Sequence, residues 1–227
     1  MGTADTPSAG IKPALQMQRR SSTIGMRDAN PRGKLPPMNY LAHLHLGGPA
    51  PAQLLGSLYG DFVKGPLAGR FAADIEAAIR LHRRIDVFTD SHPAVLAARA
   101  RFPAERRRTS GILLDLFFDH CLARAWDDYA SEPLPVFTAR VYGVLTVTPE
   151  LPGRLAQIAP RMAAQDWLGS YREPASLPRV VDAMRRRLSR PQLLDNAEDE
   201  LARLYDPLWE DFREFYPQLM RFAETQR

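Results

Sequence analysis

The stretch LHRRIDVFTD, residues 81–90, sets a histidine and two aspartates among apolar side chains. Apolar residues recur at helical spacing from Phe71 to Phe88, which predicts a helix. His82 and Asp86 stand four residues apart and therefore share one face of it, with Asp90 one turn further on. A charge in apolar surroundings is costly unless a partner or a metal ion satisfies it. This helix therefore carries a candidate site.

A second stretch, LDLFFDH at residues 114–120, has the same mixture of side chains. Asp115 and Asp119 lie one turn apart on the same helical face, and His120 follows directly. Asp119 and His120 are therefore candidates for the same site. The adjacent Cys121 is interpreted as a packed small side chain rather than a nucleophile.

Two further candidates come earlier in the chain. His43 and His45 would share a face in a strand but would point about 200° apart in a helix, so a helix would prevent them from binding one ion together. Buried, hydrogen-bonded histidines are an equally good interpretation of both. Asp61 falls near the end of a helix expected from about Ala52 to Val63. A carboxylate there opposes the helix dipole, which favours a nearby cation over a simple surface aspartate.

The rest of the chain predicts an all-α fold. Helical spacing dominates, β-branched alternation is confined to residues 141–147, and Ser91 with Pro93 is suited to start a helix. The aromatic residues of 205–216 recur at three- and four-residue steps, which predicts a buried stripe. Prolines are expected to separate the later helices, at positions 149, 152, 160, 174, 178, 191, 207 and 217.

Length and composition favour one folded domain. The chain has 227 residues, of which 45% are hydrophobic. Residues 1–37 are rich in glycine, proline, serine and basic side chains without apolar periodicity, so we expect a disordered leader before a helical domain at 38–227. One cysteine and no long apolar run predict a cytoplasmic protein that neither forms a disulfide framework nor enters a membrane.

The charge pattern points to an anionic partner or substrate. The net charge is +4, and the excess is mostly arginine. Arg83 and Arg84 directly follow His82 and are suited to phosphate oxygens, although salt bridges to nearby aspartates explain them equally well. Arginine clusters at 106–108 and 185–187 could form a basic docking surface or simply solvated helix faces.

Imidazole and carboxylate ligands of this mixture suit Mn²⁺, Mg²⁺, Fe²⁺ or Zn²⁺, and the lack of clustered cysteines argues against structural zinc. A catalytic ion could polarise a phosphoryl oxygen and activate water. Because histidine and aspartate pairs four residues apart are common on helices, a purely structural polar pair is the competing interpretation.

Several motifs in order resemble the acyl carrier protein phosphodiesterase family. They are NYLAH at 39–43, GDFVKG at 60–65, LHRRIDVFTD at 81–90, FDH at 118–120 and FYP at 215–217, so the resemblance spans residues 38 to 227. It implies a helical hydrolase similar to a divergent branch of the HD-domain phosphohydrolases. Unlike that superfamily, the chain lacks an adjacent His-Asp pair: Arg83 follows His82, and Asp119-His120 has the reverse order.

The resemblance implies that the protein removes 4′-phosphopantetheine from holo acyl carrier protein, an acidic helical bundle, by phosphodiester hydrolysis. Mn²⁺ is the implied ion, with Mg²⁺ or Fe²⁺ as alternatives, and the implied partner is neither a nucleic acid nor a membrane. Arg83 or Lys64 would neutralise the phosphate's nonbridging oxygens. The implied pool of metal ligands is His43, Asp61, His82, Asp86, Asp119 and His120.

Two other functions fit the same residues. The first is an HD-like phosphohydrolase that acts on a small nucleotide. The second is a non-catalytic helical adaptor that binds an acidic partner through its arginines, with steep salt dependence and no bound metal. The clustering of histidine and aspartate in apolar surroundings disfavours the adaptor.

Overall fold

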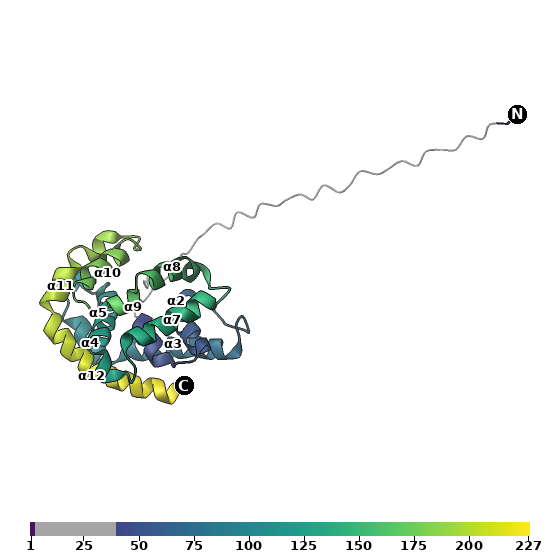
Figure 1. Cartoon of the computed structure of the whole chain (residues 1–227). Helices are drawn as coiled ribbons and strands as arrows, with labels where there is room; N and C mark the ends of the chain where they lie inside the picture. Colours follow the sequence, from purple (N-terminus) through teal and green to yellow (C-terminus); the bar gives the residue numbers. More distant parts are fainter. Residues whose placement is uncertain (3–39) are drawn as a thin grey trace. The chain divides into compact units, whose positions relative to one another are not determined.

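The computed structural model describes residues 1–2 and 40–227 (Figure 1). Within 40–227 every regular element is helical, which confirms the all-α prediction. The expectation of a disordered leader at 1–37 falls, apart from the first two residues, outside the described part of the chain.

Three helices at the start of the described domain carry most of the site candidates. They are α1 (Tyr40–Gly47), α2 (Pro51–Phe62) and α3 (Ala73–Ser91), and α2 packs along α3 (Figure 1). The close approach depends on Gly56, because a Cβ there would lie 2.4 Å from Ala78 Cβ and 2.6 Å from the Ile75 carbonyl oxygen. A side chain at this position would therefore force the two helices apart.

The remaining elements complete a core of buried aliphatic and aromatic side chains. In order they are α4 (Pro93–Ala100), η1 (Ala104–Arg106), α5 (Ser110–Arg124), α6 (Trp126–Tyr129), α7 (Leu134–Val147), α8 (Gly153–Ala164), α9 (Trp167–Ser170), α10 (Ser176–Arg185), η2 (Pro191–Leu194), α11 (Ala197–Arg203) and α12 (Tyr205–Gln226).

The last helix, α12, packs against α3, α4 and α5 (Figure 1). Its aromatic stripe is buried as the periodicity predicts: Phe212, Phe215 and Tyr216 are almost fully inaccessible, and Tyr205 and Trp209 are half-buried. Phe215 stacks on Phe118 with ring centroids 5.9 Å apart, so the stripe joins α12 to α5. Cys121 is also buried, as expected for a packed side chain.

Two local predictions were wrong. Ser91 does not cap α4: it is the last residue of α3, where its hydroxyl donates to the Val87 carbonyl, and the His92 imidazole accepts from Ala94 N instead. Four of the prolines expected to separate helices lie within α-helices instead: Pro160 and Pro217 are inside α8 and α12, and Pro178 and Pro207 are in the first turns of α10 and α12. The β-branched residues 141–147 belong to α7, in agreement with the all-α prediction, and Val141 and Leu145, four residues apart, are both buried. Among the described residues no helix has the length and apolar character needed to span a membrane.

Candidate metal centre

Four of the predicted ligands meet in one cluster, contributed by the first three helices. His43 of α1 and His82 of α3 stack with ring centroids 3.7 Å apart, at an interplanar angle of 17°. Asp86 lies against both rings, with Oδ1 3.1 Å from His43 Nε2 and Oδ2 3.6 Å from His82 Nε2. Asp61, near the end of α2, places Oδ1 3.7 Å from His82 Nε2.

His82 is held in a fixed orientation by its other ring nitrogen. Nδ1 lies 2.7 Å from the Ser57 carbonyl oxygen and donates to it, which leaves Nε2 as the nitrogen with a free lone pair. Burial, with a smaller contribution from His43, lowers the pKa of His82 to about 3, so the ring is neutral. Gly60 makes room for this ring, because a Cβ there would lie 2.2 Å from His82 Cγ. A neutral imidazole whose other ring nitrogen is held by a hydrogen bond is the form that binds metals.

Asp61 is a deeply buried acidic side chain. Its side chain is 2% exposed, and neither oxygen has a hydrogen-bond partner among the described residues. Burial, and next the charge of Asp86, raise the pKa of Asp61 well above its usual range, whereas Lys64 lowers it. A group in this state costs free energy unless something positive binds it.

The donor atoms of the cluster fit a divalent cation. One ligand atom each from His43, His82 and Asp86 lies within 4.8 Å of the others, and Asp61 adds carboxylate oxygens beside His82. His82 Nε2, like the Asp61 oxygens, is buried without a described partner. Two imidazoles and two carboxylates form a donor set suited to Mn²⁺, Fe²⁺ or Zn²⁺. Asp86 is the most exposed of the four, with 31% of its side chain accessible, so the cluster opens to solvent at Asp86.

Asp119 does not join this cluster. Its two oxygens accept hydrogen bonds from Leu41 N and Ala42 N, each at 2.9 Å, so the carboxylate caps the N-terminus of α1. Burial raises the pKa of Asp119 to about 8, against the lowering effect of those two backbone donors. Its role in the structure is to fix the helix that carries His43.

His120 also lies outside the cluster, with both ring nitrogens engaged elsewhere. Nδ1 donates to the Tyr171 carbonyl oxygen at 2.7 Å, so Nε2 accepts from the Tyr205 hydroxyl at 2.7 Å. Arg124 in turn donates to the oxygen of that hydroxyl. Neighbouring residues on a helix point about 100° apart, which is why Asp119 and His120 reach different surroundings.

Asp115 is a site candidate that sequence reasoning did not select. Burial, and next the charge of Asp86, raise its pKa well above the usual range, so the carboxylate lies within electrostatic reach of the cluster. It also lines a small cavity with Thr89, whose buried hydroxyl has no partner among the described residues. The sequence pointed to Asp115 only through its position, one turn before Asp119 on an otherwise apolar helix.

Two cationic side chains flank the cluster as the sequence suggested. Arg83 follows His82 on α3, and its Nη2 donates to the Val63 carbonyl at 2.9 Å, two residues beyond Asp61. Lys64 is exposed at the end of the same segment, and its charge acts on Asp61. Each of the two is thus close in sequence to a cluster residue, Arg83 one residue after His82 and Lys64 three residues after Asp61.

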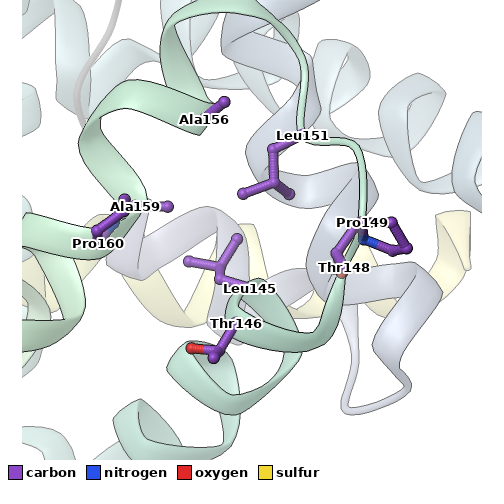
Figure 2. A pocket seen from close by; sticks show the side chains of 8 residues that line it. All are labelled: Leu145, Thr146, Thr148, Pro149, Leu151, Ala156, Ala159 and Pro160. Carbon is purple, nitrogen blue, oxygen red and sulfur yellow. The ribbon is translucent and has the colours of Figure 1, made fainter.

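A larger cavity, of about 310 Å³, lies between α7 and α8 (Figure 2). Leu145, Leu151 and Ala159 point into it, with threonines and prolines at its edge (Figure 2). None of the cluster residues lines this cavity, and it has no ionisable side chain in its wall. The wall of this cavity therefore offers no group suited to metal binding or proton transfer.

Comparisons with known proteins give matches over nearly all of the described domain. The model of the family described as acyl carrier protein phosphodiesterase matches residues 38–219. The acyl carrier protein phosphodiesterase of Serratia proteamaculans (strain 568) is 39% identical over 192 residues, covering 84% of this chain and 100% of that protein. The protein of the same name from Yersinia pestis is 38% identical, with the same coverage. No solved structure gives a significant match.

Proposed function

Because this chain belongs to the acyl carrier protein phosphodiesterase family, we propose that it removes 4′-phosphopantetheine from holo acyl carrier protein. The bond cut is the phosphodiester between the prosthetic group and a serine of the carrier. Water supplies the hydroxyl that the phosphorus gains and the proton that the serine oxygen takes up. The products are apo acyl carrier protein and 4′-phosphopantetheine.

The observation that supports this reaction most strongly is the uncompensated donor cluster. Asp61 and His82 present buried oxygen and nitrogen atoms without hydrogen-bond partners among the described residues, next to Asp86 and His43. We infer that these four residues hold Mn²⁺, with Mg²⁺ or Fe²⁺ as alternatives. When bound, such an ion supplies charge stabilisation at the phosphoryl oxygens and lowers the pKa of water.

The chain's own residues orient and bind the diester. Asp86 marks the opening through which the phosphate reaches the cluster, because the other three side chains are almost fully buried. Arg83 is anchored on the Val63 carbonyl, and Lys64 stands beside Asp61, so both hold positive charge next to the nonbridging oxygens. Asp115 lies within electrostatic reach of Asp86, and we infer that it is a further candidate beside the four ligands.

Mass spectrometry of purified holo acyl carrier protein tests the reaction. Incubation with this protein and Mn²⁺ should remove the mass of the 4′-phosphopantetheinyl group, and EDTA should prevent the loss. No mass loss from a metal-loaded protein would refute the proposal and would direct attention to small nucleotides as substrates.

Asp61→Asn tests the metal centre within the same experiment. It should abolish both the mass loss and the rise in melting temperature that Mn²⁺ gives the wild-type protein. Asp74→Asn is the matched control, because Asp74 is an exposed aspartate in the first turn of α3. An Asp61→Asn variant with wild-type turnover would remove this residue from the site.

A further inference from the structure

The chemistry of the proposed reaction restricts where the protein substrate can dock. This step rests on the proposed function: the phosphate is joined directly to a serine on the surface of the carrier, so the body of the carrier must reach the opening of the cluster. That opening is at Asp86, whose side chain is 31% exposed, whereas His43 and His82 are each 1% exposed. The docking surface therefore has to surround Asp86.

The residues around Asp86 on α3 form an exposed basic face. With about 100° of rotation per residue, Arg83 lies about 60° and Val87 about 100° around the helix from Asp86. Arg84 lies a further 60° round the helix from Val87, about 160° from Asp86. Arg84 is exposed and Arg83 is half-buried, and Val87 is 70% exposed, which is high for a valine. We call Arg83, Arg84 and Val87 the α3 face.

The charges of the α3 face are not neutralised by carboxylates of the described chain. Arg83 donates to the Val63 carbonyl, and Arg84 donates to the Gln226 carbonyl at 3.2 Å. Neither guanidinium forms an ion pair with a described carboxylate. Their full charge is therefore available to a partner, next to an apolar side chain that a partner could cover.

Of the two arginine clusters suggested by the sequence, the one at 185–187 differs in this respect. Arg185 and Arg186 both pair with Asp182, the former at 2.9 Å. Arg106 is held by the backbone carbonyls of Leu193 and Asp195. These arginines connect parts of their own fold, and none of them is the residue next to a ligand of the cluster.

We propose that the α3 face is the docking surface for the acidic carrier protein, with Arg84 pairing with its carboxylates and Val87 covered by an apolar side chain. Charge complementarity selects this occupant: a cationic face with an apolar centre fits an acidic helical protein. The face adjoins the opening of the cluster, as a bond at the carrier's own surface requires.

The test uses Arg84→Glu and Val87→Asp in the full chain. The measured quantities are the KM for holo acyl carrier protein and the Kd for fluorescently labelled apo acyl carrier protein. We expect both constants to rise about three- to tenfold for Arg84→Glu, because reversal replaces an attraction with a repulsion, and to become less sensitive to salt. The Mn²⁺-induced rise in melting temperature should be unchanged in both variants.

Arg107→Glu and Val147→Asp are the matched controls. Arg107 is an exposed arginine of the competing cluster, and Val147 is a valine of α7 that is 78% exposed. Neither should alter KM or Kd. Wild-type constants in Arg84→Glu and Val87→Asp, or an equal rise in the controls, would overturn the docking proposal. Absence of turnover by the wild-type protein would instead refute the proposed function, since the Kd reports docking without catalysis.

Discussion

Replacing Asp119 with alanine should strongly destabilise the protein, because Asp119 caps the N-terminus of α1. The carboxylate accepts from Leu41 N and Ala42 N, both at 2.9 Å and both buried at the start of α1. Each of the two donors left unsatisfied costs about 1–3 kcal/mol, so the free energy of unfolding should fall by about 2–6 kcal/mol. Asp119→Asn keeps one carbonyl oxygen as an acceptor and should cost about 1–2 kcal/mol.

Urea unfolding followed by circular dichroism measures both losses. Mn²⁺ binding to the folded Asp119→Asn protein, followed by calorimetry, separates a capping role from a ligand role. We expect its Mn²⁺ affinity to match that of the wild-type protein, because Asp119 directs both oxygens at backbone N–H groups. A loss of less than about 1 kcal/mol in Asp119→Ala would refute the capping argument. So would an Asn variant of wild-type stability that no longer binds Mn²⁺.

Three further outcomes follow from the same structure. Gly56→Ala should cost about 1–3 kcal/mol in urea unfolding by separating α2 from α3, whereas Gly143→Ala, with open space around its Cβ, should be neutral or stabilising; equal costs would contradict the packing argument. Tyr205→Phe should lose about 0.5–1.5 kcal/mol with its bond to His120 but keep wild-type Mn²⁺ binding, and a weakened Mn²⁺ affinity would place His120 in the site. Burial raises the pKa of Asp119 to about 8, above its value near 3.9 in an unfolded chain, so the folded state holds the extra proton between these values. The free energy of unfolding should therefore fall as the pH rises from about 4 to about 8, and it should fall more steeply in the wild-type protein than in Asp119→Asn. Equal slopes of unfolding free energy against pH in the two proteins would argue against the raised pKa.

Periodicity was enough to predict the helices and part of the site. His82 and Asp86 share a face because they are four residues apart on a regular helix, and Asp61 falls near a helix end where a carboxylate is unfavourable. These are local properties, and the structure brings the three residues together. The buried aromatic stripe of α12 was predictable for the same reason.

The roles of the two aspartates of α5 could not be predicted, because they depend on how distant helices pack. Asp119 meets backbone donors 78 and 77 residues earlier in the chain, and no spacing rule indicates that pairing. Asp115, on the same face, instead lies near Asp86. The sequence also left open whether His43 joins the cluster, because this depended on whether residues 40–47 form a helix. In the helix α1, His43 and His45 point in different directions, and His45 contacts Tyr216 and Tyr129 instead.

The capping of α1 by Asp119 also bears on the order in which the site is completed during synthesis. All four clustered residues lie between positions 43 and 86, so they leave the ribosome early. The carboxylate that secures the start of α1 is made more than thirty residues after Asp86. Until α5 has docked, His43 sits on a short helix whose first amides lack their acceptor. A nascent chain truncated before α5 should therefore contain every residue of the cluster and still bind Mn²⁺ weakly, so metal affinity would report when α5 has docked.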